Sequence, residues 1–198
     1  MPLHSKILIH WTGRKGINPQ GERMDDSLRR KYVDRLRDIC QKGLYMKPGA
    51  EKIYGINNTM IQTTIARICF TEIKLSQAEE QAKRYGDLGI GFGRDFVLER
   101  EGNPVFYVQN GDKGHVIENF SFLHRFVAPN EERRKELEII LGYLKNMSEM
   151  NDGGLKYYEE MEWRVVHLEK FEGRYIAVED KLNHIYRLTL KPEDIKII

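Results

Sequence analysis

Three short polar clusters stand where predicted strands end, and together they contain the residue types that chemistry at a sugar carbon requires. They are His10-Trp11-Thr12, Phe70-Thr71-Glu72 and Glu160-Met161-Glu162. When nicotinamide leaves NAD, the ribose resembles an oxocarbenium ion, and a fixed carboxylate beside it stabilises the developing positive charge. A histidine and a threonine hydroxyl can hold the ribose and the amide in the required pose. The three clusters are therefore candidate parts of one NAD site.

Each cluster also has a purely structural interpretation, which is the more common one for such residues taken singly. His10 could be a core histidine whose hydrogen bonds are satisfied, and Thr71 with Glu72 could cap the following helix. The acidic residues between 159 and 162 could form a solvated edge ahead of a strand. The sequence leaves both interpretations open.

The second cluster opens a module of strand, short helix and glycine-rich strand over residues 67–92. The apolar run that begins it predicts a buried strand, and residues 76–84 predict the helix. Glycines at 89, 91 and 93 weaken the second strand, so they indicate close approach of another backbone or a ligand. Tyr85 lies at the mouth of the module and is a further candidate for cofactor binding.

The composition is that of a soluble globular protein, because 40% of the 198 residues are hydrophobic and 31% are charged. This length predicts a single domain over residues 1–198. The net charge of +2 neither demands nor excludes a polyanionic partner. Cys40 and Cys69 lie in apolar patterns, which is typical of buried, reduced thiols. No apolar run reaches membrane-spanning length, so we expect a cytoplasmic protein with no membrane partner.

The first part of the chain predicts a buried strand over residues 5–12 and a helix from Asp25 or Asp26 to about Lys42. The outer face of this helix is basic and carries Arg29, Arg30, Lys31, Arg35 and Arg37. Such a face could contact the phosphates of a nucleic acid, but interleaved aspartates make a solvated face the more common outcome. Residues 44–64 contain several turn signals and predict an irregular loop.

The second part of the chain predicts a short helix over residues 94–100 and a strand over 105–108. Residues 116–127 predict a helix that buries Phe120, Leu123 and Phe126. The clearest helix covers 131–147, where apolar residues recur with helical spacing at Leu137, Ile140, Leu141, Leu144 and Met147. A closing hairpin pairs 174–178 with 184–190, and residues 195–198 have the pattern of a terminal strand.

Common catalytic motifs are absent from the sequence. It contains no phosphate-binding loop of the GxxxxGKS or GxxxxGKT type, no GxSxG nucleophile elbow and no HExxH helix. The glycines between 86 and 93 do not have the spacing of a dinucleotide fingerprint. The histidines and cysteines lack the spacing of a zinc site, so we expect no metal.

Several short motifs spread over most of the chain resemble the AbiGi family of abortive phage-infection proteins. The motifs are His10-x-Thr12, Ile68-Cys69-Phe70-Thr71-Glu72, Tyr85-Gly86-x-x-Gly89-Ile90-Gly91-Phe92, Asn103-Pro104-Val105-x-Tyr107 and Glu160-x-Glu162-Trp163-Arg164. Members of this family are described as antitoxins of type IV toxin–antitoxin pairs. The resemblance implies a role in phage defence, with a toxin or a nucleic acid as partner.

The chain is more distantly similar to ADP-ribosyltransferase-like folds, including the DNA-modifying DarT toxins, which also open with a His-x-Thr strand. This similarity implies that His10, Thr12 and Thr71 hold NAD as the cofactor-like substrate. It further implies that Glu162 is catalytic and stabilises the oxocarbenium ion, while Glu160 orients the acceptor. The second-strand motif departs from the Ser-Thr-Ser form of that superfamily, because it supplies only one hydroxyl.

Both resemblances imply an α+β fold with a bent, split, mixed β-sheet core and surrounding helices, like that of ADP-ribosyltransferases. Two functions are compatible with this expectation. One is an enzyme that transfers ADP-ribose from NAD to nucleic acid or protein, and the other is an antitoxin or regulator that binds without chemistry. An open cleft in which Glu162 faces His10 favours the enzyme. A filled cleft, or a Glu162 that points to solvent, favours the binding protein.

Overall fold

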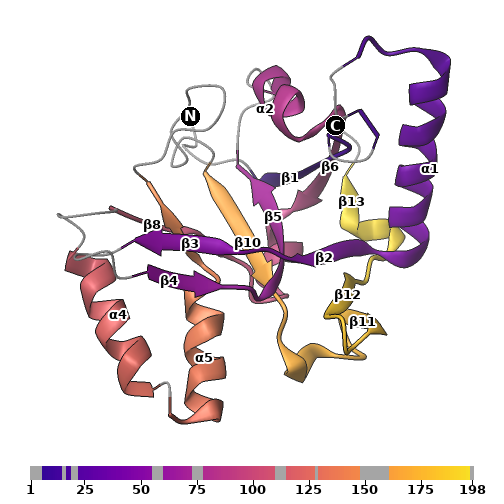
Figure 1. The fold of residues 1–198 in the computed structure, drawn as a ribbon. Helices are drawn as coiled ribbons and strands as arrows, with labels where there is room; N and C mark the ends of the chain where they lie inside the picture. The colour runs from indigo at the N-terminus through magenta and orange to yellow at the C-terminus, as the bar shows by residue number, and fades with distance from the viewer. Residues whose placement is uncertain are drawn as a thin grey trace.

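A curled β-sheet forms the centre of the molecule in the computed structural model (Figure 1). The structure describes residues 6–14, 17–18, 22–54, 60–72, 78–109, 115–127, 129–147 and 161–196. The strands of the large sheet are β1 Ile7–Thr12, β2 Leu44–Pro48, β5 Ala66–Thr71, β6 Leu88–Gly93, β7 Asn103–Pro104, β10 Glu162–Val166, β11 Ile176–Asp180, β12 Ile185–Leu188 and β13 Ile195–Lys196. They follow the order β11, β12, β2, β5, β1, β6 and β13, with β10 on β5 and β7 on β10.

The large sheet is antiparallel in all of its described pairings, which corrects the expectation of a mixed sheet. Parallel pairing occurs in a separate small sheet, between β8, Phe106–Val108, and β9, Leu144–Asn146. A third sheet is the antiparallel pair of β3, Glu51–Tyr54, and β4, Met60–Thr63. The fold is therefore α+β, as expected, with a curled antiparallel sheet at its centre.

The large sheet is split along one edge of β5. The opposite edge of β5 pairs along its whole length with β10, from Thr71 to Arg67. The split edge pairs with β2 at Ala66 and Arg67, but with β1 at Thr71. β1 and β2 thus leave the same strand in different directions, which is the bent and split sheet that we expected.

The main hydrophobic core lies under one face of this sheet. Because strand side chains alternate between faces, every second residue of β5 enters the core, namely Ala66, Ile68 and Phe70. Phe92 of β6 and Val165 of β10 meet these residues from the neighbouring strands. The same alternation directs the intervening residues of β5 to the other face, where the candidate site lies.

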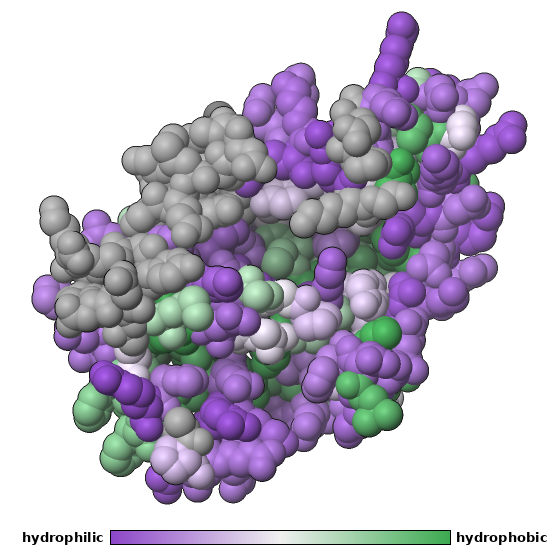
Figure 2. All heavy atoms as spheres, viewed as in Figure 1, coloured by the Kyte–Doolittle hydropathy of each residue, from purple (hydrophilic) through white to green (hydrophobic). Residues whose placement is uncertain are grey.

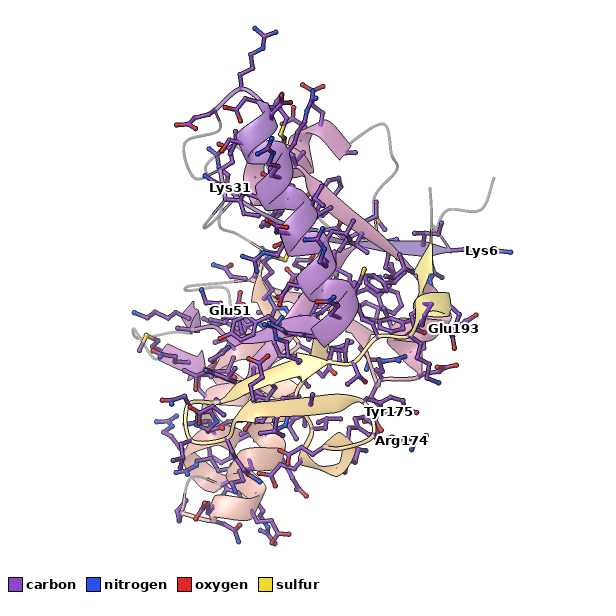
Figure 3. All side chains as sticks on the ribbon, turned by 90° about the vertical axis from the view of Figure 1, so that its right-hand side faces the viewer. Lys6, Lys31, Glu51, Arg174, Tyr175 and Glu193 are labelled. Carbon is purple, nitrogen blue, oxygen red and sulfur yellow. The ribbon has the colours of Figure 1, made fainter. Side chains whose placement is uncertain are left out.

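Helix α1, Asp26–Lys42, packs beside the sheet and begins and ends as the sequence predicts (Figure 1). The Asp25 side chain accepts a hydrogen bond from the Leu28 backbone N–H at 2.7 Å, which satisfies a donor at the helix start. Gly43 follows the helix with φ +90°, a conformation that favours glycine. Figure 3 shows this helix in front, with Lys31 on its charged outer side.

The basic face of α1 is a solvated face. Asp26 lies 3.6 Å from Arg29, Asp34 lies 2.7 Å from Arg37, and Asp38 lies 2.9 Å from Lys42. These exposed pairs are one helical turn apart, and each contributes about 0.3–0.5 kcal/mol at most. Of the two interpretations of this helix, the geometry favours the solvated one.

A smaller core joins β3, β4, β8 and β9 to two helices, α4, His115–Val127, and α5, Glu131–Leu141. Ile53, Ile61 and Val108 come from the strands, and Ile117 and Leu141 come from the helices. In Figure 1 the two helices lie side by side below β3 and β4. The irregular loop predicted over residues 44–64 is therefore wrong, because this segment forms β2, β3 and β4.

Helix α5 ends at Leu141, six residues earlier than predicted. Gly142 ends it, and its backbone N–H donates to the Glu138 carbonyl at 2.9 Å. A Cβ at this glycine would lie 2.8 Å from Ile65 Cγ2, so the backbone packs where no side chain fits. Leu144 is buried as predicted, but it lies in β9 instead of the helix.

Helix α4 covers the predicted residues but turns a different side to the core. Ile117 and Ser121 are buried, whereas Leu123 is 45% exposed and Phe126 is 69% exposed. Phe120 is partly buried against the smaller core. The side of α4 that faces the core therefore differs from the predicted side by about one residue position around the helix.

The remaining elements match the sequence pattern closely. Helix α2 covers Ala78–Tyr85, and the predicted cap at Ser76 lies outside the described residues. Helix α3 covers Arg94–Leu98, and β11 and β12 form the predicted closing hairpin. Short 3-10 turns occupy Glu169–Phe171 and Pro192–Asp194. None of the described helices combines the length and the apolar character that crossing a bilayer requires.

Both cysteines are free and exposed, which corrects the expectation of buried thiols. Cys40 lies on the outer side of α1. Cys69 lies between Ile68 and Phe70 on β5, so alternation turns its side chain away from the core.

Candidate functional site

A cleft of about 790 Å³ opens on the face of the sheet opposite the main core. It is lined by Ile9, His10, Trp11, Tyr45, Lys47, Ala50, Glu51, Lys52, Arg67, Ile68, Cys69, Thr71, Tyr85, Lys145, Glu162 and Arg164. Figure 2 shows a recess near the centre of this face of the molecule. The volume is in the range typical of small-molecule sites.

Strand alternation and the split of the sheet determine which side chains reach the cleft. Thr71 of β5 pairs with Glu162 of β10, and Cys69 pairs with Arg164, so these four residues share one face. On the split edge, Lys47 of β2 pairs with Arg67. The cleft therefore lies above β5, where β1 and β2 diverge.

Glu162, the predicted catalytic carboxylate, is 4% exposed and lies between two cations. Arg164 Nε donates to Glu162 Oε1 at 2.6 Å, and Lys145 Nζ donates to Glu162 Oε2. Arg164 in turn donates to the backbone carbonyls of Gly142 at 2.8 Å and Leu144 at 3.0 Å. Both carboxylate oxygens of Glu162 are thus engaged by charged donors in the floor of the cleft.

A second carboxylate, Glu51, links this ion pair to the rim of the cleft. Its Oε2 accepts a hydrogen bond from Arg164 Nη2 at 2.8 Å and another from Arg67 Nη2 at 2.9 Å. Glu51 is the first residue of β3 and is labelled in Figure 3. One carboxylate therefore serves two guanidinium groups, and the network carries an excess of positive charge.

These contacts keep Glu162 ionised. Burial alone would raise the pKa of Glu162, but the charges of Arg164 and Lys145 outweigh it and lower the pKa to about 2. Burial would likewise lower the pKa of Arg164, but Glu162 outweighs it and raises that pKa. The buried pair is therefore fully charged at neutral pH.

Cys69 lies beside Glu162 but does not have the properties of a nucleophile. Its side chain is exposed on the cleft side of β5. Loss of solvation, together with the charge of Glu162, raises the pKa of Cys69 to about 12. The thiolate is the reactive form, and a raised pKa keeps Cys69 protonated at neutral pH.

His10 lines the cleft and also bridges the split of the sheet. Its Nδ1 donates to the Cys69 carbonyl at 2.9 Å, across the gap that opens between β1 and β5. Its ring meets Phe70 edge-on at 5.9 Å, on the core side of β5. Burial lowers the pKa of His10 despite the hydrogen bond to Cys69, so the ring is neutral at pH 7. Glu162 belongs to β10, which pairs with the edge of β5 opposite to β1. The contacts of His10 with β5 therefore account for it as a structural bridge.

Thr71 is buried, and its hydroxyl is occupied within the protein. It accepts a hydrogen bond from Trp11 Nε1 at 3.0 Å and lies 3.4 Å from the Ile9 carbonyl. The Trp11 ring rests on Gly89 of β6, where a Cβ would lie 2.9 Å from Trp11 Cζ3. This contact explains Gly89, one of the three alternating glycines. The close neighbour that the sequence pattern indicated at this position is an aromatic ring of the protein.

The other predicted site residues have different positions. Tyr85, at the end of α2, lines the cleft with His10, Thr71 and Glu162. Thr12 is half-buried at the end of β1, opposite Leu88, and is not among the residues that line the cleft. Glu160 lies outside the described residues.

Glu72 belongs to a neighbouring pocket. It is bound by Arg94 and accepts a hydrogen bond from Trp163 Nε1 at 2.9 Å. This pocket of about 350 Å³ also includes Val105 and Tyr107. Glu72 therefore anchors β5 to β10 and α3. The residues that connect it to α2 lie outside the described part of the chain.

Sequence reasoning missed most of the charged residues of the cleft, namely Lys47, Glu51, Lys52, Arg67, Lys145 and Arg164. Arg164 could have been found, because a residue two positions after Glu162 in a strand must share its face. Lys145 fell inside the helix that was predicted too long. Lys47, Glu51 and Lys52 fell inside the segment that was predicted to be an irregular loop.

A comparison with protein families gives one match over most of the chain. The sequence model of the family described as “Putative abortive phage resistance protein AbiGi, antitoxin” matches residues 45–198. The chain belongs to the AbiGi family. Family membership implies a role in phage defence, and the word antitoxin implies a toxin as partner.

The matched range includes β5, β10 and the ion pairs of Glu162, but it begins after β1, so His10 and Thr12 lie outside it. No curated protein and no solved structure matches the chain. The likeness to DarT and to ADP-ribosyltransferases finds no support in these comparisons. NAD binding and the single-domain boundary stay predictions.

Proposed function

We propose that this AbiGi protein acts in phage defence as a cytoplasmic antitoxin that works by binding, without transferring ADP-ribose. The observation that carries the proposal is the pairing of Glu162 with both Lys145 and Arg164. A catalytic carboxylate must present uncompensated negative charge to a ribose that becomes positive. A carboxylate held between two cations presents a net positive field instead, which opposes an oxocarbenium ion.

The surrounding residues support the same interpretation. The hydroxyl of Thr71 is bound by Trp11, and Nδ1 of His10 is bound by the Cys69 carbonyl. The Thr71 hydroxyl and the His10 Nδ1, two of the groups that would hold NAD in the enzymatic hypothesis, therefore already have partners within the protein. Polar groups that are fully paired inside a fold stabilise that fold, and a ligand would have to break these contacts to use them.

An enzymatic function is the second candidate, and one observation favours it. Thr71, Tyr85 and Glu162 come from three separate elements and line the same cleft. The cleft has a volume suitable for part of a dinucleotide. In this alternative, NAD would bind with its nicotinamide ribose near Glu162, and ADP-ribose would pass to nucleic acid or protein.

Growth of a host cell distinguishes the two functions. We expect that production of the chain alone leaves growth unchanged, and that co-production with the toxin of its pair restores growth arrested by that toxin. Growth arrest by the chain alone, relieved in Glu162→Gln that is still produced in soluble form, would overturn the proposal.

A further inference from the structure

The cleft carries more positive charge than its own carboxylates neutralise. Its described lining holds Lys47, Lys52, Arg67, Lys145 and Arg164 against Glu51 and Glu162. Glu162 is shared by Lys145 and Arg164, while Glu51 is shared by Arg164 and Arg67. Within the described part of the chain, Lys47 and Lys52 have no ion-pair partner, and both are exposed.

The position of Lys47 makes this excess charge costly in the absence of a ligand. Lys47 pairs directly with Arg67 across the ladder between β2 and β5. Like charges opposite each other on neighbouring strands destabilise a sheet. Arg67 is 10% exposed and already shares its carboxylate with Arg164. An anion bound between Lys47, Lys52 and Arg67 would remove this repulsion.

The cleft also presents aromatic rings beside these cations. Trp11 is held by its hydrogen bond to Thr71 and by its contact with Gly89, so its orientation is fixed before a ligand arrives. Tyr45 is 39% exposed and precedes Lys47 by two residues on β2, which places both side chains on the same face. Fixed aromatic rings next to a positively charged groove are the usual means of binding a nucleobase together with its phosphates.

We infer that the cleft binds a nucleotide, with the phosphates at Lys47, Lys52 and Arg67 and the base against the ring of Trp11. This inference rests on the proposed function, in which the protein acts by binding and carries out no chemistry. A free nucleotide and the end of a single-stranded nucleic acid share this chemistry. Comparison of ATP with a short oligonucleotide distinguishes the two.

The test measures thermal stability and tryptophan fluorescence of the full chain with four probes: ATP, NAD, a five-nucleotide oligothymidine and inorganic triphosphate. Binding to the folded state must raise the melting temperature. We expect ATP or the oligonucleotide to bind more tightly than triphosphate and to quench the fluorescence of Trp11. Raising the salt concentration should weaken binding, because the phosphate contacts are ionic.

Two variants locate the ligand. The double variant Lys47→Ala with Lys52→Ala should weaken binding of the best probe at least tenfold, while the melting temperature without ligand stays unchanged or rises. Trp11→Leu should weaken nucleotide binding by roughly tenfold, in line with the loss of one stacked base, and leave triphosphate binding unchanged. Lys31→Ala on the outer side of α1 is the matched control and should bind like the wild type.

The outcomes separate this inference from the proposed function. Tighter binding of ATP than of the oligonucleotide identifies a free nucleotide as ligand, and the reverse order identifies a single strand. Failure of all nucleotides to bind at millimolar concentration, or equal binding by triphosphate and ATP, would overturn the inference and leave the antitoxin function standing. Release of nicotinamide from NAD would instead overturn the proposed function.

Discussion

At neutral pH the carboxylate of Glu162 is ionised, buried and in contact with two cations. Removing one partner from a buried ion pair leaves an uncompensated charge, which costs more than the pair itself contributes. Arg164 would keep Glu51 and two backbone carbonyls, but Lys145 would lose the carboxylate of Glu162. Glu162 therefore has a structural role that any mutational test of catalysis must take into account.

Glu162→Gln should lower the free energy of unfolding by about 3–5 kcal/mol at pH 7. Because the pKa of Glu162 is lower in the folded state than in the unfolded chain, its contribution is fully present above pH 4.5. It is lost as the pH falls from 4.5 towards 2, so the difference between the two proteins should narrow in that window. Urea unfolding at pH 7, 5 and 3.5 measures this difference. A difference that stays constant with pH would contradict the ionised pair.

At the scale of the elements, one glycine explains why α5 is shorter than the sequence pattern predicts. The apolar spacing continues from Leu137 to Met147, so periodicity alone predicts one long helix. Gly142 interrupts it because its backbone packs against Ile65 and Val166. That contact joins residues far apart in sequence, and no local pattern reveals it. Strands β1, β5 and β6 were predictable because each has a contiguous apolar run or glycine alternation.

The substitution Gly142→Ala distinguishes a continuous helix over 131–147 from a helix that ends at Leu141, because the two predict opposite signs for the change in the free energy of unfolding. In a continuous helix, alanine would stabilise the protein by about 1 kcal/mol relative to glycine. In the observed structure a Cβ would lie 2.8 Å from Ile65 Cγ2 and 3.0 Å from Val166 Cγ1, so we expect destabilisation by about 1–3 kcal/mol. Glu136→Ala, at an exposed position of α5, is the control and should change the stability by less than about 0.5 kcal/mol. Thermal unfolding of the three proteins measures both effects, and a stabilised Gly142→Ala protein would refute the observed helix end.

The rotated face of α4 can be tested in the same way. Phe126 is exposed and Ile117 is fully buried, although the sequence pattern placed Phe126 in the core. Phe126→Ser should change the free energy of unfolding by less than about 0.5 kcal/mol, whereas Ile117→Ala should cost about 2–5 kcal/mol. Chemical denaturation measures both values. A large loss for Phe126→Ser and a small one for Ile117→Ala would restore the sequence-based orientation.

At the scale of the whole molecule, the cleft depends on residues that the chain brings together from distant segments. Glu51, Lys145 and Glu162 come from β3, β9 and β10, and two of these strands were not predicted. Thr71, Tyr85 and Glu162, which the sequence analysis assigned to one candidate NAD site, line the same cleft. The sequence did not predict the cations that neutralise Glu162. The identity of a carboxylate can be read from the sequence, but its electrostatic surroundings depend on tertiary contacts.

The release of nicotinamide from NAD by the purified protein is the most direct test of this account. We predict no release above the uncatalysed rate at millimolar NAD, because Glu162 is held between Lys145 and Arg164. Release by the wild type that disappears in Glu162→Gln, in a sample shown to unfold cooperatively, would contradict the account and establish the cleft as a catalytic site.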